Sequence, residues 1–184
     1  MRWLRLLLLL LVVPLAACSL SGREASYLVE TKGPYLLDTG DVVRVTVYGD
    51  DSLNKSYKVD DSGAISFPLV GPVPVRGKTA EAAASAIAAA LANGFMRDPN
   101  VAAEVETYRP FFIQGAVASG GQFTYVYGMT VRAAIATAGG YTDTANRNQA
   151  TIYRRQGKTM VKGNVNLDFP IYPGDTIVVA ERWL

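Results

Sequence analysis

The sequence predicts an α+β protein, in which short strands form most of the structure and a few helices cover them. Two observations support this class. Segments with alternating apolar and polar residues recur along the chain, as in residues 42–48, where valines fall on one face. Two helical segments, 79–93 and 130–138, lie between such strands. Because 49% of the residues are hydrophobic, we expect a packed core rather than disorder.

The first 17 residues are typical of a secretory signal peptide. Arg2 and Arg5 precede an uncharged run from Leu6 to Ala17, which is shorter than the roughly 20 residues that a membrane-spanning helix needs. The step Leu-Ala-Ala-Cys that ends at Cys18 resembles the lipobox of bacterial lipoproteins. We therefore expect cleavage before Cys18 and lipidation of that cysteine, the alternative being an ordinary signal peptide with a chance cysteine.

The residues after the cleavage point predict where the protein is held. Cys18 is the only cysteine, so no disulfide can form within one chain. Ser19 follows it, and this residue favours sorting to the outer membrane, with the body on the periplasmic face. Residues 18–33 are polar and lack clear periodicity, and we expect them to form a tether.

The first folded unit is expected over residues 34–107. A turn at 60–63 separates the strand at 42–48 from a second strand at 64–69. The alanine-rich helix that follows has Thr79 to cap its start and Gly94 to end it. Within it, Ile87 and Leu91 lie four residues apart and mark the buried side. A last strand is expected at 101–106.

The second unit is expected over residues 108–184. We predict strands at 111–117, 150–155, 159–162 and 176–180, a turn at 119–121, and a helix capped by Thr130 and ended by Gly139 and Gly140. Gly40-Asp41 and Gly174-Asp175 each introduce a valine-rich strand, one in each unit. Gly supplies an unusual backbone angle in such a turn, and Asp accepts hydrogen bonds from nearby amides.

Charge and composition exclude several classes of function. Removal of residues 1–17 leaves 16 basic and 16 acidic residues, and a neutral chain argues against nucleic-acid binding. The chain has no histidine, which removes Ser-His-Asp and Cys-His catalysis and most transition-metal sites. We therefore expect no enzyme activity, no cofactor and no metal site.

Two sequence patterns resemble known functional motifs but lack features that those motifs require. Residues 71–79 approach a phosphate-binding loop, but five residues separate the glycines instead of four, and two of them are prolines without amide hydrogens. We expect a turn and a helix cap there. Asp50-Asp51 and Asp60-Asp61 are adjacent pairs, whereas glycoside hydrolysis needs two carboxyl groups about 5–10 Å apart across a cleft. A hydrolase remains open only if distant acids converge.

Tyrosines form the remaining candidate class of functional residues. The chain has ten, and tyrosines can stack on sugars or line a polysaccharide channel. The alternative is that they sit half-buried on sheets, where aromatic residues favour strands. The candidates are Tyr35, Tyr48, Tyr57, Tyr108, Tyr125, Tyr127, Tyr141, Tyr153 and Tyr172.

The first unit carries four motifs in a fixed order: Tyr35-x-Leu37-x-x-Gly40-Asp41-x-x-x-Val45-x-Val47, Val59-Asp60-x-x-Gly63-x-Ile65-x-Phe67-Pro68-x-x-Gly71, Gly77-x-Thr79 and Pro99-x-Val101. In this order and behind a lipobox, these motifs resemble the outer-membrane polysaccharide export proteins, the Wza-like family. The second unit carries Ile113-x-Gly115-x-Val117, Thr130-x-x-x-Ala134-Ile135-x-x-Ala138-Gly139-Gly140, Asn148 and Pro173-Gly174-Asp175-x-Ile177-x-Val179. Through these motifs it resembles a soluble-ligand-binding β-grasp (SLBB) domain.

The resemblance implies a periplasmic lipoprotein that forms a homo-oligomeric ring, guides a capsular or extracellular polysaccharide, and docks on an inner-membrane polysaccharide co-polymerase. Long members add further β-grasp domains and a C-terminal amphipathic helix that crosses the outer membrane. The sequence printed here ends soon after its last strand, so we expect a separate outer-membrane β-barrel to complete the passage. A glycan-binding module that forms no conduit is the alternative.

Overall fold

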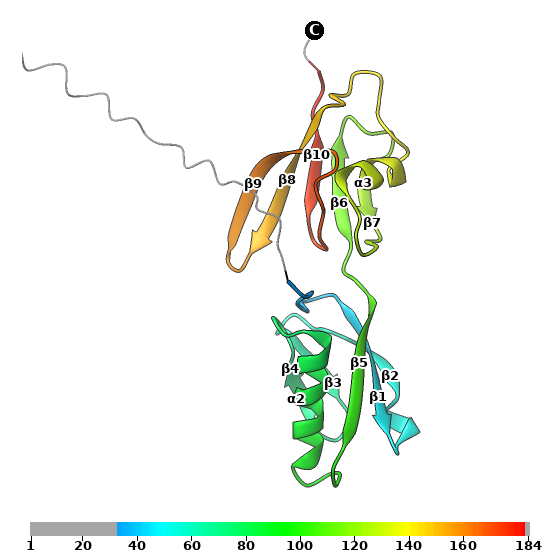
Figure 1. The fold of residues 1–184 in the computed structure, drawn as a ribbon, viewed down its shortest axis with the longest axis vertical. Coiled ribbons are helices and arrows are strands. Elements are labelled where there is room, and N and C mark those ends of the chain that lie inside the picture. Colours follow the sequence, from blue (N-terminus) through cyan, green and yellow to red (C-terminus); the bar gives the residue numbers. More distant parts are fainter. Residues whose placement is uncertain (1–32, 183–184) are drawn as a thin grey trace, which may run out of the picture.

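The structure is a computed structural model that describes residues 33–182 (Figure 1). Its strands and helices form two β-rich units that follow one another along the long axis of the molecule. Each unit has its own hydrophobic cluster and its own helix. The predicted α+β class is therefore confirmed.

The first unit is built on a three-stranded antiparallel sheet in the order β2–β1–β5. The central strand, β1 (Val42–Tyr48), pairs with β2 (Lys55–Lys58) on one side and with β5 (Asn100–Thr107) on the other. The valines of β1 that alternate along one face are fully buried, as the period of two predicts. A short 3-10 helix, η1 (Asp51–Leu53), connects β1 to β2.

Helix α2 (Ala80–Ala92) packs beside β5 and closes the core of the first unit (Figure 1). The side chain of Thr79 accepts a hydrogen bond of 3.1 Å from the backbone N–H of Ala82, so the predicted cap is confirmed. Ile87 and Leu91 are fully buried on the inner side, as their spacing predicts.

A separate two-stranded hairpin joins β3 (Ala64–Phe67) to β4 (Gly71–Pro74). The sequence predicts the first of these strands, but it ends two residues earlier than expected. Strand β4 is not predicted from the sequence, because Pro72 and Pro74 are typical strand breakers. Prolines are tolerated here because β4 has a single partner strand, so their missing amides interrupt no central ladder. Strand β2 is not predicted either, because it has only one partially buried residue and therefore no apolar alternation.

The second unit is a five-stranded mixed sheet in the order β7–β6–β10–β8–β9. The strand β10 runs parallel to β6 and antiparallel to β8, so it lies at the centre. Helix α3 (Val131–Thr137) packs on one face of the sheet, with Thr130 as its cap. The strands are β6 (Phe111–Gly115), β7 (Gly121–Phe123), β8 (Gln149–Gln156), β9 (Thr159–Asn166) and β10 (Thr176–Val179).

The strands of this unit differ from the sequence prediction chiefly at β6, β7 and β9. Strand β6 ends at Gly115, whose φ of +94° turns the chain before Val117. The predicted turn at 119–121 leads directly into the short edge strand β7. Strand β9 continues to Asn166 instead of ending at residue 162, because its register with β8 extends along all eight residues.

Candidate functional site

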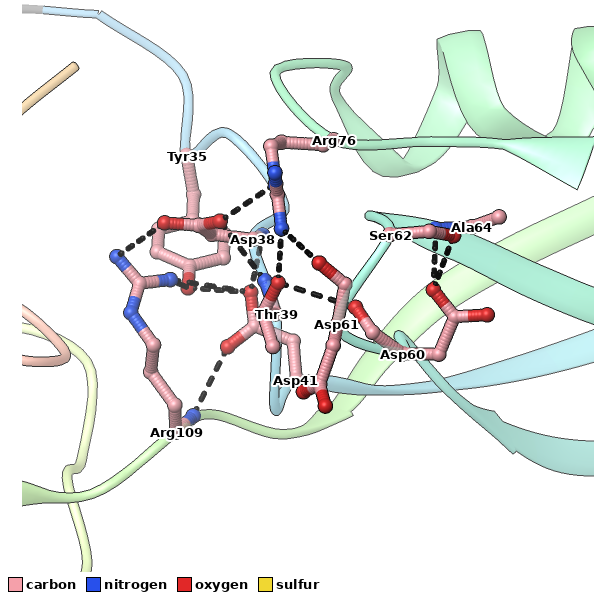
Figure 2. A network of polar contacts seen from close by, with 10 residues as sticks. All are labelled: Tyr35, Asp38, Thr39, Asp41, Asp60, Asp61, Ser62, Ala64, Arg76 and Arg109. Atoms are coloured by element: carbon pink, nitrogen blue, oxygen red, sulfur yellow. Dashed lines mark hydrogen bonds and ion pairs between the residues drawn. The ribbon is translucent and has the colours of Figure 1, made fainter. Parts of the chain in front are cut away.

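A network of polar contacts joins the two units where β5 leads into β6 (Figure 2). We call it the junction network and define it as Tyr35, Asp38, Asp41, Arg76 and Arg109. The first four residues belong to the first unit, and Arg109 stands at the start of the second. The network is therefore the polar connection by which one unit holds the other.

Asp41 is the centre of the network and is fully buried. Its Oδ2 accepts hydrogen bonds from the backbone N–H of Asp38 at 2.8 Å and from the hydroxyl of Tyr35 at 2.6 Å. Its Oδ1 accepts one from the backbone N–H of Arg109 at 2.9 Å. A carboxylate that accepts this many hydrogen bonds is compensated for its burial.

The second unit contains an equivalent turn, as the repeated Gly-Asp pair predicts. Asp175 is buried, and its Oδ2 accepts a hydrogen bond of 2.8 Å from the backbone N–H of Tyr172, three residues earlier. The backbone N–H of Asp175 donates to the carbonyl of Tyr172, as that of Asp41 does to Asp38. Gly174 has a φ of +84°, which suits this turn and disfavours other residues.

Arg109 lies against both turns. Its Nη1 donates to the hydroxyl of Tyr35 at 2.7 Å and lies 3.3 Å from Oδ2 of Asp41. A side chain at Gly174 would place its Cβ 2.9 Å from Nε of Arg109, so the glycine leaves the space that the guanidinium needs. The backbone N–H of Gly174 also donates to the carbonyl of Pro110 at 2.9 Å. Arg109 therefore connects the start of β1 to the start of β10.

Tyr35 adds an aromatic contact to this polar one. Burial raises the pKa of Tyr35 far above its ordinary value, and the hydrogen bond to Asp41 raises it further. The ring of Tyr35 packs on the first core and meets the ring of Tyr108 edge-on, with centroids 4.8 Å apart. Tyr108 packs on the second core and meets Tyr125 in the same way at 5.4 Å. The three rings thus link the two cores.

Arg76 extends the network across the first unit. Its Nε forms an ion pair of 3.1 Å with Asp38, and its Nη2 donates to the carbonyl of Asp61 at 2.9 Å and to the hydroxyl of Thr39. Gly63 leaves room for it, since a Cβ there would lie 2.6 Å from Cβ of Arg76. The turn before β3 is thereby tied to the turn before β1 (Figure 2).

A second buried ion pair stabilises the second unit itself. Arg154 binds Asp175 through two hydrogen bonds of 2.9 and 2.7 Å, and its guanidinium lies 4.2 Å from the ring centroid of Tyr172. Burial raises the pKa of Asp175, and the bonds to Arg154 oppose that effect. In the second turn, Asp175 therefore faces its own sheet, whereas Gly174 faces Arg109.

The junction network suits a structural role. Its carboxylates, hydroxyls and guanidiniums bond to one another or to the backbone. Within residues 33–182, no group of three or more His, Cys, Asp or Glu side chains is arranged to hold a metal ion. No helix in the same range is both long enough and apolar enough to cross a membrane. The geometry can fix the orientation of two units.

The other candidates from the sequence are assigned as follows. Asp50 accepts hydrogen bonds from Ser52 at the start of η1. Asp60 closes the turn before β3, where hydrogen bonds from Ser62 and Ala64 lower its pKa. These acids are turn residues. The segment 71–79 contains the expected turn and the cap of α2, but it begins with strand β4, which the sequence did not predict. Cys18 lies outside the described residues.

The tyrosines divide between the two interpretations. Tyr57 packs on Phe67 and donates its hydroxyl to the carbonyl of Leu53, which is the structural role. Tyr48 and Tyr127 are exposed by 60% and 75% and are available to a partner. The role of Arg109 is not predicted from the sequence. The only local signal is a basic residue between an aromatic residue and Pro110, at the point where one unit passes into the next.

Comparison with known proteins identifies both units. Residues 29–106 match the family model for polysaccharide biosynthesis/export proteins, and residues 110–163 match the SLBB domain. Arg109 lies between the two matched ranges. The junction is therefore the connection between an export domain and an SLBB domain.

Two relatives are similar over parts of the chain. The exopolysaccharide production protein ExoF of Rhizobium meliloti is 34% identical over 91 residues, which are 48% of this chain and 22% of the relative. The polysialic acid transport protein KpsD of Escherichia coli is 28% identical over 160 residues, which are 80% of this chain and 28% of the relative. The chain thus spans about a quarter of the length of these relatives. Its first unit belongs to the polysaccharide biosynthesis/export family, and its second unit carries an SLBB domain.

Proposed function

We propose that this protein is a lipoprotein of the outer membrane that forms part of a conduit for a capsular or extracellular polysaccharide. In this proposal Cys18 carries the lipid, residues 18–33 tether the body, and the two units over 34–107 and 108–184 lie in the periplasm. The partners are the polysaccharide, further copies of the chain in a ring, an inner-membrane co-polymerase and a separate outer-membrane β-barrel.

The observation that carries this proposal is the junction network, taken together with the family match. A conduit needs walls that keep their shape while a polymer passes. The partly buried hydrogen bonds between Arg109, Asp41 and Tyr35 hold an export domain and an SLBB domain in one orientation. The names of the two relatives, which concern exopolysaccharide production and polysialic acid transport, support a glycan cargo.

The edges of both sheets support assembly into a ring. Strands β2 and β5 end the first sheet, and β7 and β9 end the second, so each sheet presents unpaired backbone groups at two edges. The outer side of α2 is lined mainly with alanine, with Glu81 as its only charged residue. These surfaces allow a neighbouring copy to approach closely.

Cys18→Ser tests the lipid anchor. The wild-type protein should fractionate with outer membranes and carry the mass of its acyl chains, because several chains hold a protein firmly to a bilayer. The variant should stay uncleaved or be released from the membrane. Equal mass and equal membrane fractions for the two proteins would contradict the anchor.

Native mass measurement tests the ring and separates it from the alternative, a periplasmic glycan-binding module. Lipidated protein in detergent, alone and with its co-polymerase, should give a closed oligomer of one size. Monomer under every one of these conditions would favour the binding module.

A further inference from the structure

The loop between α3 and β8 lies beside the residues that follow β10, at the end of the second unit opposite the junction (Figure 1). The backbone N–H of Asn146 donates to the carbonyl of Ala180 at 2.8 Å, and that of Arg182 donates to the carbonyl of Thr144 at 2.7 Å. Ala145, between these two bonds, is 2% exposed and belongs to the second core. The backbone of this loop is therefore fixed to the sheet.

The loop and the residues after β10 surround an open hollow of about 610 Å³. This volume lies within the range of about 300–1,000 Å³ that is typical of ligand sites. Such sites are usually lined mainly by apolar side chains, whereas all but one of the residues around this hollow are polar or charged. A ligand that fits it must therefore be polar over most of its surface. We call it the polar hollow, and it is lined by Asp143, Ala145, Asn146, Arg147, Asn148 and Arg182.

The charged groups of the polar hollow have no ionic partner in the part of the chain that the structure describes. No ion pair among residues 33–182 involves Asp143, Arg147 or Arg182. Glu181 lies on the neighbouring β-bridge and is exposed, but it does not line the hollow. Two guanidiniums and one carboxylate therefore surround the same space without contacting one another.

Two contacts position side chains of the polar hollow. Oδ1 of Asn146 accepts a hydrogen bond of 3.0 Å from the backbone N–H of Asn148. The guanidinium carbon of Arg147 lies 5.6 Å from the ring centroid of Tyr141, which is a cation–π distance. Side chains that are already positioned lose less conformational freedom when a ligand binds. The hollow is therefore partly organised before binding.

The mixture of hydrogen-bonding groups decides the class of ligand. A guanidinium only donates, a carboxylate only accepts, and a carboxamide does both. A phosphate or sulfate ion would be repelled by Asp143, and a cation would be repelled by the two arginines. The hydroxyl groups of a sugar both donate and accept, so a sugar can bond to every kind of group in this lining.

We propose that the polar hollow binds a segment of the exported polysaccharide through its sugar hydroxyl groups. This inference rests on the proposed export function and adds to it the surface that contacts the glycan. Asp143 accepts hydrogen bonds from hydroxyl groups, Arg147 and Arg182 donate to hydroxyl oxygens, and the carboxamide of Asn148 does both.

Titration calorimetry on the full-length protein in detergent tests the proposal. The probes are hexasaccharides released by partial hydrolysis of the cells' own exported polysaccharide, and inorganic sulfate is the competing anion. The hexasaccharides should bind the wild-type protein, and sulfate should not displace them. Asn148→Ala and Arg182→Gln should each reduce the affinity about fivefold, the effect of one lost hydrogen bond. Asp143→Asn should also weaken binding of the hexasaccharides, whereas it would strengthen binding at an anion site.

Arg155→Gln is the matched control. It removes an exposed arginine near the other end of β8, about 20 Å from the start of that strand, and should leave the affinity unchanged. Equal losses in Arg182→Gln and Arg155→Gln would overturn the proposal, because binding would then follow net charge alone. Absence of binding by the wild-type protein, displacement by sulfate or tighter binding by Asp143→Asn would overturn it too. So would a change of oligomer mass in Arg182→Gln, since the hollow would then be an interface between copies.

A complementation assay separates this inference from the export function. Cells that lack the gene and receive the wild-type copy should export their polysaccharide, and cells with Asn148→Ala and Arg182→Gln combined should export less at equal protein level. Normal export with the double variant would overturn the polar hollow as a site for the cargo while export stands. Normal export without the gene would overturn the export function itself.

Discussion

At the scale of single residues, two buried aspartates do similar work in the two units. Asp41 and Asp175 each accept a backbone hydrogen bond that closes a turn, and each binds an arginine. Arg109 bonds to Asp41 across the junction, while Arg154 bonds to Asp175 within its own sheet. The same local motif therefore serves to join two units in one case and to stabilise one core in the other.

Asp175→Asn should destabilise the protein strongly. The side chains of Arg154 and Asp175 are 6% and 1% exposed, and Nη1 of Arg154 already lacks a partner, so the variant leaves a buried guanidinium without its counter-charge. The expected loss is about 3–5 kcal/mol of unfolding free energy, measured by urea denaturation. The control is Asp168→Asn, which breaks an ion pair whose side chains are 62% and 77% exposed and should cost about 0–1 kcal/mol. Similar losses in both variants would contradict the argument.

Tyr35 should make stability depend on alkaline pH. Its pKa in the folded protein is raised above the ordinary value of 10.0, so the unfolded chain releases this proton first. The contribution is fully present below pH 10 and is lost as the pH rises beyond that value. In urea denaturation from pH 8 to 11, Tyr35→Phe should lose stability with a shallower slope than the wild type.

Tyr127→Phe is the control for that experiment, since it removes one hydroxyl from an exposed ring. An unchanged slope in Tyr35→Phe would show that the hydroxyl of Tyr35 has no part in the alkaline dependence.

At the scale of elements, the pairing of β6 with β10 depends on one glycine. Gly115 has a φ of +94°, and a Cβ at this position would lie 2.1 Å from the carbonyl oxygen of Val179. Backbone atoms of β10 occupy that space, so rotation of a side chain cannot relieve the clash.

Gly115→Ala should therefore unfold the edge of this parallel pair and destabilise the protein by more than about 2 kcal/mol. Gly128→Ala is the matched control, because Gly128 has a similar φ of +83° but nothing within 4 Å of its Cβ. It should cost about 1 kcal/mol from backbone strain alone. Thermal unfolding compares the two, and an equal loss would show that the contact with Val179 is unimportant.

At the scale of the whole molecule, the two units have separate cores, and the junction decides how they are oriented. Arg109, Tyr35 and Asp41 supply the polar bonds, and the rings of Tyr35, Tyr108 and Tyr125 supply the apolar contact. Few other contacts are needed, because each unit already buries its own apolar residues.

Arg109→Ala should loosen the orientation of the units while leaving both cores folded. It removes charged hydrogen bonds worth about 2 kcal/mol and frees the hydroxyl of Tyr35 from one partner. Spin labels at Ser85→Cys and Lys158→Cys, in a Cys18→Ser background, should give a broader distance distribution than in the parent protein. Arg132→Ala should leave the distribution unchanged, and an unchanged distribution for Arg109→Ala would contradict the role of the junction.

The sequence by itself determined the features that depend on near neighbours. The alternating valines of β1, the cap at Thr79, the Gly-Asp turns and the family motifs all rest on residues a few positions apart, where backbone geometry sets the outcome. For the same reason, the sequence alone argued that the adjacent aspartates are turn residues and not catalytic pairs. Strands without apolar alternation, such as β2 and β4, could not be predicted from the sequence, because only their pairing with a neighbouring strand identifies them.

Only the tertiary structure decided the junction. Arg109 reaches Asp41 across 68 positions and Tyr35 across 74, and no local pattern encodes contacts over such separations. The pairing of the strands likewise decides which side chains of β6, β10, β8 and β9 become neighbours. Composition supplies the side chains, and the folding of the sheets decides which of them lie side by side.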